Sequence, residues 1–160
     1  MTIGAADVIL IRHATAPGVG DPANVKVGDC TTQRNLSEQG RAEARKLGEE
    51  FRRRGVHIGK VLTSQWCRTR ETARLAFPKE KSHDEPAFNS WFGQVPTESE
   101  SQLKIARAIL NGWKGPGVLV VVTHAVNISA VAAVKTAPAQ AVVMRRDAGG
   151  SMRVVGTLVP

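Results

Sequence analysis

Two wholly apolar runs dominate this sequence, and each leads to a histidine. The first run, residues 8–11, continues directly into Arg12 and His13, and the second, residues 118–122, reaches His124 after one threonine. Apolar runs of this length that are rich in β-branched residues are typical of strands buried on both faces of a sheet. Such strands deliver the polar groups that follow them to the rim of the sheet, where open α/β sheets bind their ligands.

The remaining patterns alternate between strands and helices. We expect strands at residues 7–12, 58–63, 118–122, 140–145 and 152–159, a short strand near 85–88, and helices at 38–54, 68–77, 97–113 and from 125 onward. This alternation predicts an α/β fold, a three-layer α/β/α sandwich with a mostly parallel central sheet. No repeat or linker interrupts the 160 residues, so we expect a single domain over residues 1–160.

A long loop separates the first strand from the first helix. It runs from Ala14 to about Asn35 and carries several Gly and Pro turn signals. Connections of more than 20 residues are uncommon in compact domains and are usually functional or disordered. Ser37 then has the properties of a helix N-cap, and Gly55 follows the expected end of that helix.

The charge balance favours anionic partners. Lys and Arg number 22 against 14 Asp and Glu, a formal net charge of +8. Nucleic-acid binding usually combines a basic patch with aromatic residues, but the Phe and Trp residues are few and scattered. The three arginines at 52–54 complement the dipole at a helix C-terminus instead. We therefore expect a small phosphorylated or otherwise anionic substrate and no nucleic-acid partner.

No apolar run approaches the ~20 residues that a membrane-spanning helix requires. The N-terminus lacks a basic region followed by a long apolar stretch, so no export signal is visible. The chain is therefore expected to be cytoplasmic, or to be the mature form of an exported protein.

The two cysteines, Cys30 and Cys67, leave two alternatives open. They do not form a Cys-x-x-Cys pair, which argues against a zinc site or a thioredoxin-type motif. They could form one disulfide in an oxidising compartment, or remain free thiols in a reducing one.

Four residues at three predicted strand ends form the candidate site. Arg12 and His13 follow the first strand, Arg68 lies just after the strand at 58–63, and His124 follows the second apolar run. The carboxyl ends of parallel strands share one edge, so these side chains can converge there. Guanidinium groups bind phosphate oxygens through paired hydrogen bonds. Imidazoles can supply a nucleophile and a hydrogen-bond donor.

Helix N-termini near residues 67 and 125 would add backbone N–H groups to this phosphate site. The other two histidines and the three tryptophans lack such a setting, and we expect them to be surface or packing residues: His57, His83, Trp66, Trp91 and Trp113.

Four segments together resemble the histidine phosphatase (phosphoglycerate mutase-like) superfamily. Arg12-His13-Ala14 is similar to its Arg-His-Gly/Ala motif, and residues 36–40 to its Leu-Ser/Thr-x-x-Gly helix start. Residues 64–73 resemble its Ser-x-x-x-Arg-x-x-x-Thr-Ala segment, and residues 122–124 its second-histidine strand. The matches occur in family order and extend over most of the chain. Residues 29–37 and 123–128 look most like a small bacterial subgroup that is often exported.

The resemblance implies a two-step phosphoryl transfer without a metal or other cofactor. His13 would attack phosphorus and become a phosphohistidine, which water would then hydrolyse. Arg12, Arg68 and His124 would hold the phosphate oxygens and stabilise their charge. His13 must be neutral to attack, and the neighbouring arginines should favour the neutral form.

The sequence departs from the family at the general acid. Many members carry a Glu a few residues before an aromatic-Gly pair, but alignment of Phe92-Gly93 with that pair places Asn89 there. Another branch has an Asp directly after the second histidine, where this chain has Ala125. A positioned acid typically contributes ~10²–10⁴-fold to the rate. Five carboxylates could substitute for it: Asp21, Asp29, Glu85, Glu98 and Glu100.

These departures leave three functions to consider. The first is a metal-independent phosphomonoester hydrolase that works through phospho-His13. The second is a phosphohistidine protein phosphatase, because small members of that kind act without the acid on a phosphoramidate. The third is a phosphoanion-binding module without turnover. Phosphoglycerate mutase ranks last, because the chain is short and lacks the Glu.

Overall fold

The computed structural model describes residues 1–91 and 96–160, and within them it contains one six-stranded sheet in the order β3-β2-β4-β1-β5-β6. The strands are β1 Val8–Arg12, β2 Ile58–Thr63, β3 Ser82–Asp84, β4 Val118–Thr123, β5 Ala141–Arg146 and β6 Met152–Leu158. The helices are α1 Glu38–Arg53, α2 Cys67–Ala76, α3 Pro96–Gly112 and α4 Ala125–Ala132, with 3₁₀ turns η1 Cys30–Thr32 and η2 Pro86–Phe88. No helix in these described ranges is long and apolar enough to cross a membrane.

The sheet is mostly parallel, as predicted. β1 pairs in parallel with β4, and β2 pairs in parallel with both β3 and β4. The antiparallel part is the pair β5 and β6 at one side, with β5 next to β1. The register places Arg12 opposite Thr123, and the backbone N–H of His13 donates to the Thr123 carbonyl at 3.0 Å. Both histidine-bearing strands therefore end at the same level of one sheet edge.

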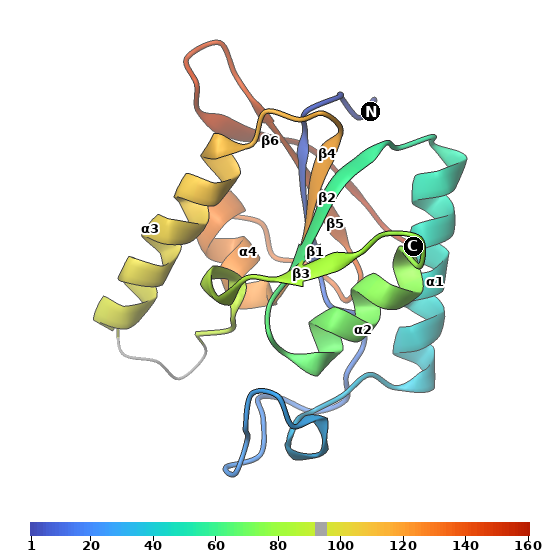
Figure 1. Ribbon diagram of the computed structural model, residues 1–160, viewed down its shortest axis with the longest axis vertical. Coiled ribbons are helices and arrows are strands. Elements are labelled where there is room, and N and C mark those ends of the chain that lie inside the picture. Colours follow the sequence, from blue (N-terminus) through green and yellow to red (C-terminus); the bar gives the residue numbers. More distant parts are fainter. Residues whose placement is uncertain (92–95) are drawn as a thin grey trace.

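Two helices cover each face of the sheet, which confirms the three-layer sandwich (Figure 1). Successive residues of a strand point to opposite faces, and β1 follows this rule with buried residues on both. Ile9 and Ile11 pack in the cluster that contains Phe51 of α1. Val8 and Leu10 pack in the cluster that contains Leu110 of α3. The central strand is thus buried on both sides, as its uninterrupted apolar sequence indicated.

α1 begins where the sequence predicted and packs closely against its neighbours. The Ser37 hydroxyl accepts a hydrogen bond from the Gly40 N–H at 3.1 Å, which is an N-cap interaction. A Cβ at Gly40 would overlap the Thr15 carbonyl, and one at Gly48 would overlap the Ala76 carbonyl. These two glycines therefore let α1 approach the loop after β1 and the end of α2.

The prediction of a short strand near residues 85–88 is wrong. The strand β3 lies earlier, and residues Pro86–Phe88 form the 3₁₀ turn η2. Pro86 has no N–H to donate to a strand ladder. The Glu85 carboxylate also accepts the Ala87 N–H at 3.1 Å, which stabilises a turn.

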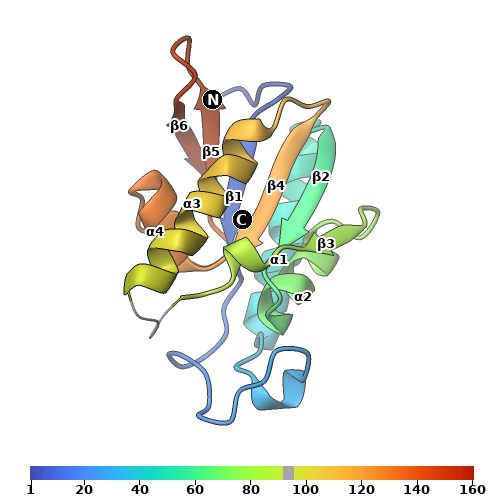
Figure 2. The same ribbon diagram turned by 60° about the vertical axis from the view of Figure 1, so that its left-hand side comes forward.

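The long loop between β1 and α1 extends beyond the carboxyl edge of the sheet (Figures 1 and 2). It contains η1, and a disulfide joins Cys30 of this turn to Cys67, the first residue of α2. Of the two alternatives for the cysteines, the structure has the disulfide. The loop is therefore attached to the helix that carries Arg68.

Candidate active site

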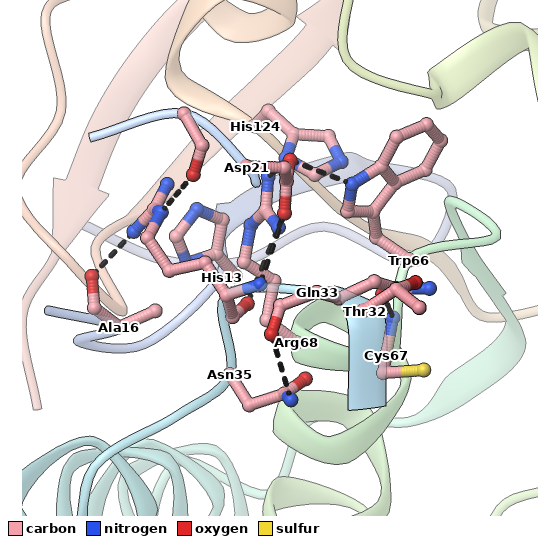
Figure 3. Close-up of polar contacts among 12 residues, drawn as sticks. His13, Ala16, Asp21, Thr32, Gln33, Asn35, Trp66, Cys67, Arg68 and His124 are labelled. Carbon is pink, nitrogen blue, oxygen red and sulfur yellow. Dashed lines mark hydrogen bonds and ion pairs between the residues drawn. The ribbon is translucent and has the colours of Figure 1, made fainter. Parts of the chain in front are cut away.

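The four predicted site residues lie together in one cavity of about 510 Å³ at the carboxyl edge of the sheet. Arg12 is the last residue of β1 and His13 follows it, Arg68 is the second residue of α2, and His124 is the N-cap of α4. Four further segments complete the lining: the loop after β1 with Val19, Gly20, Asp21, Val25 and Arg34, the N-cap of α2 with Trp66, the chain after η2 with Ser90, and the N-terminus of α4 with Ala125 and Val126. Figure 3 shows His13, Arg68 and His124 grouped together beside Asp21.

The His13 ring is held in one tautomer. Its Nδ1 lies 2.8 Å from the Ala14 carbonyl oxygen, and because a carbonyl can only accept, Nδ1 carries the proton. The lone pair is therefore on Nε2. The Ala14 N–H donates to the Thr72 hydroxyl at 3.0 Å, so α2 fixes the backbone beside the imidazole.

His13 is neutral in this site. Its pKa is lowered from 6.5 to about 3, with burial as the largest cause and the guanidinium groups of Arg68, Arg34 and Arg12 adding to the shift. The hydrogen bond to the Ala14 carbonyl acts in the opposite direction but is outweighed. The arginines thus favour the neutral form, as expected, but burial contributes more.

His124 is also buried and neutral. Its Nε2 lies 2.9 Å from the Ser64 hydroxyl, which fixes the ring, and its centroid lies 5.5 Å from that of His13. Burial first, and then the neighbouring His13 and the arginines, hold the pKa of His124 well below its usual value. Two uncharged imidazoles therefore lie side by side among cationic groups.

The two predicted arginines have incompletely used donors. Arg12 donates through Nη1 to the Thr136 carbonyl at 2.7 Å. Arg68 donates through Nη1 and Nη2 to the two carboxylate oxygens of Asp21, at 2.9 and 3.2 Å. The Nε atoms of both arginines are buried and have no hydrogen-bond partner among the described residues. Buried donors are normally paired, so these two N–H groups fit an anion acceptor that completes them.

Two further residues of the cavity were missed by sequence reasoning. Arg34 extends from the long loop and donates to the Gly20 carbonyl at 2.6 Å and to the Ala16 carbonyl. Trp66 was expected to be a packing residue, but it lines the cavity and its indole N–H donates to Asp21 at 3.0 Å. Neither residue belongs to a periodic pattern, and the signal that could have indicated them is the family resemblance, because Arg34 lies in the segment 29–37 and Trp66 in the segment 64–73.

The two helix N-termini differ in what they offer. The Cys67 N–H of α2 is already paired, since it donates to the Gln33 side chain at 2.8 Å. The sequence predicted that this N–H would be available to a ligand, but in the structure the Gln33 side chain already accepts it. At α4, His124 makes no side-chain cap, and Ala125 and Val126 line the cavity.

The family model of the histidine phosphatase superfamily (branch 1) matches residues 8–104, more than half of the chain. The chain belongs to the histidine phosphatase superfamily. No curated protein sequence matches it, but solved structures share its fold. A candidate alpha-ribazole-5'-P phosphatase from Escherichia coli has a TM-score of 0.72 at 15% identity, over 98% of both chains.

Two other solved structures extend the fold comparison. The protein histidine phosphatase SixA, complexed with tungstate, has a TM-score of 0.58 at 15% identity, over 96% of this chain and 97% of its own. A phosphoglycerate mutase from Thermus thermophilus has a TM-score of 0.62 at 18% identity, over 96% and 99%. Identities this low establish the fold alone, while superfamily membership points to a phosphatase.

Asn89, which the sequence alignment places where many histidine phosphatases carry a Glu, has no acidic proton to supply. The Asn89 side-chain oxygen accepts the Gln65 N–H at 2.8 Å, and its amide donates to the Gln65 side-chain oxygen at 2.9 Å. Asn89 does not line the cavity. The Phe92-Gly93 pair used for the alignment lies outside the described residues.

Of the five carboxylates that could substitute in this histidine phosphatase, Asp21 lines the cavity. Asp29 caps η1 and Glu85 caps η2, while Glu98 and Glu100 are exposed on α3. Burial acts to raise the pKa of Asp21, but hydrogen bonds from Arg68, the Arg34 N–H and Trp66 outweigh it and lower the pKa. Asp21 is thus a stabilised carboxylate.

Proposed function

We propose that the chain is a metal-independent phosphatase that hydrolyses phosphomonoesters through a phosphohistidine on His13. The observation that carries the proposal is that the Nε–H groups of Arg12 and Arg68 have no partner among the described residues and belong to a cavity with two neutral imidazoles. A phosphate group supplies acceptor oxygens for these two N–H groups, and its negative charge is attracted by the cationic guanidinium groups.

In the first step, the Nε2 lone pair of His13 attacks phosphorus in line with the ester oxygen. The P–N bond forms as the P–O bond breaks, and the leaving oxygen keeps the electron pair and is protonated by water. Arg12, Arg68 and His124 hold the equatorial oxygens as their charge develops. The Nδ1–H bond to the Ala14 carbonyl stabilises the positive charge that the ring acquires.

In the second step, water attacks the phosphohistidine from the side that the leaving group has vacated. A P–O bond forms, the water loses a proton to solvent, and the electron pair of the P–N bond returns to Nε2. Inorganic phosphate leaves and His13 is neutral again. Two easier steps replace one difficult step, as is usual in covalent catalysis.

The test uses p-nitrophenyl phosphate in the presence of EDTA. The wild-type protein should release p-nitrophenolate, and His13→Ala should abolish release. His83→Ala is the matched control, because His83 is exposed on β3 and should leave the rate unchanged. Full activity of His13→Ala would rule out the mechanism, and tight phosphate binding without hydrolysis of any ester would favour a binding module instead.

A second candidate substrate is a phosphohistidine protein. It is favoured by Asn89, whose amide is bonded to Gln65 where an acid would otherwise serve an alkoxide leaving group. A phosphoramidate requires less acid assistance, and SixA, a protein histidine phosphatase, has a similar fold. A phosphorylated carrier domain should then be dephosphorylated with a higher kcat/KM than p-nitrophenyl phosphate.

A further inference from the structure

One edge of the Arg68 guanidinium is occupied and the other is not. A guanidinium has five N–H donors in a fixed planar fork, with one terminal edge, Nη1 and Nη2, and one lateral edge, Nε and Nη2. Asp21 takes the terminal edge with one carboxylate oxygen on each nitrogen. The second Nη1 proton is directed at the Arg34 carbonyl, at 3.3 Å. Nε has no partner among the described residues.

We propose that Asp21 is a positioning residue whose carboxylate holds the terminal edge of Arg68 so that the lateral edge takes two oxygens of a bound phosphate. The proposal rests on the proposed function, because it assigns Arg68 to the phosphate. Two parallel N–H···O bonds from one planar edge are the arrangement that guanidinium groups make with phosphate. Asp21 thereby selects which edge is available.

Asp21 is itself fixed from several directions. Its Oδ1 accepts from Arg68 and from the Arg34 N–H at 3.0 Å, and its Oδ2 accepts from Arg68 and from the Trp66 indole at 3.0 Å. The side chains of Arg68 and Asp21 are only 3% and 13% exposed. A carboxylate with four N–H donors around it is held in place and kept ionised.

The same four hydrogen bonds argue against two other roles for Asp21. A proton donor to the leaving group needs a protonated oxygen, but both oxygens here accept N–H donors. A carboxylate that merely blocked the site would compete with phosphate for Arg68. The Nε atom of Arg68, which has no partner in the described part of the chain, leaves an edge for which Asp21 does not compete.

The experiment compares Asp21→Asn with Asp29→Asn, a carboxylate of the same loop that caps η1 and does not line the cavity. Binding of inorganic phosphate and of orthovanadate is measured by calorimetry, and kcat/KM is measured for p-nitrophenyl phosphate and phenyl phosphate. Asp21→Asn should weaken the binding of both anions by about tenfold or more, as expected when a charge-assisted pair is lost. Asp29→Asn should match the wild type.

Positioning also predicts an equal fractional loss of kcat/KM for the two aryl esters, and little further loss when Asp21→Asn is added to Arg68→Ala. Tighter phosphate binding by Asp21→Asn would overturn the proposal in favour of a competing carboxylate. A larger loss for phenyl phosphate, whose leaving group is poorer, would overturn it in favour of a general acid.

A second variant and the choice of calorimetry cover the remaining outcomes. If Asp21→Asn does not fold, Trp66→Phe removes one donor to the same carboxylate and should weaken phosphate binding in the same direction, and unchanged binding would contradict the proposal. Failure of the proposed function would appear as an inactive wild type or an active His13→Ala variant. Failure of the role of Asp21 would appear in the calorimetry, which needs no turnover, so the two failures are distinguishable.

Discussion

At the scale of single residues, the site combines neutral imidazoles with permanent cations. Arg12, Arg34 and Arg68 supply guanidinium cations, whereas burial removes the charge from His13 and His124. A nucleophile must offer a lone pair, and an imidazole with its usual pKa would lose that lone pair in mildly acidic solution. The buried position of His13 therefore keeps the proposed nucleophile available at low pH.

The pH dependence of His13 can be followed by NMR. The ring should remain neutral from pH 8 to pH 5, because its pKa is lowered from 6.5 to about 3. In urea-unfolded protein the same ring should titrate near its ordinary value of about 6.5. His13→Ala identifies the resonance, and a midpoint near 6.5 in the folded protein would contradict the assignment.

The same shift ties stability to pH. Between about pH 3 and 6.5 the unfolded chain binds a proton on His13 that the folded chain does not bind. Stability therefore rises with pH in this window. The contribution of the neutral ring is complete above 6.5 and is lost as the pH falls toward 3.

The residues of the site differed in how far the sequence could predict them. That Arg12, His13, Arg68 and His124 lie together could be predicted, because each lies at or after the end of a predicted strand and the carboxyl ends of parallel strands share one edge. Asp21 was one of five candidate carboxylates, and the sequence could not rank it. Its role depends on contact with Arg68, 47 residues away and on another element. Irregular loops carry no period from which such a contact can be read.

At the scale of elements, the boundaries predicted for the longer strands and helices lie within one residue of those observed, whereas the short strand was wrongly placed. β2 runs from Ile58 to Thr63, as predicted, and α1 begins after its Ser37 cap. The error fell on the short segment 85–88, where one proline and one side-chain cap decide between a strand and a turn. Such local competition is settled by one or two hydrogen bonds, which a pattern of apolar residues does not report.

The contact between α1 and α2 predicts an unusual effect of alanine. Gly48→Ala should destabilise the protein by roughly 1–3 kcal/mol, the usual range for overpacking, although alanine is the better helix former. The reason is that a Cβ at Gly48 would overlap the Ala76 carbonyl, so the two helices must separate. The free energy of unfolding in urea measures the effect.

Gly112→Ala is the matched control. Gly112 ends α3, and an added Cβ would meet no described atom within 4 Å. This substitution should leave stability unchanged or slightly raised. Equal destabilisation by both substitutions would show that helix packing is not the cause.

At the scale of the whole molecule, one disulfide connects the long loop to the site. Cys30 and Cys67 are 37 residues apart, and the segment between them contains the end of the long loop, α1 and β2. Closing a loop of this length is expected to stabilise the fold by roughly 2–4 kcal/mol. The link also holds the loop that carries Asp21 and Arg34 against the start of α2.

Removal of the disulfide should therefore lower both stability and anion affinity. The Cys30→Ser/Cys67→Ser double variant should unfold at a lower urea concentration than the wild type, and should bind orthovanadate more weakly. Dithiothreitol should have the same effects on the wild type but none on the double variant. Unchanged vanadate affinity in the double variant would show that the loop keeps its place without the covalent link.

The pairing of β1 with β4 links ligand binding to the folding equilibrium. Val8 lies opposite Leu119, so the two histidine-bearing strand ends meet only when distant halves of the chain have come together. The unfolded chain has no such site, and a ligand that binds only the native state stabilises it by about 2.7 kcal/mol at a hundred times its Kd. Phosphate or orthovanadate should thus raise the Tm of the wild type, but not that of Arg12→Ala. A substrate-rich environment would then protect the whole sheet from unfolding, well beyond the few residues that touch the phosphate.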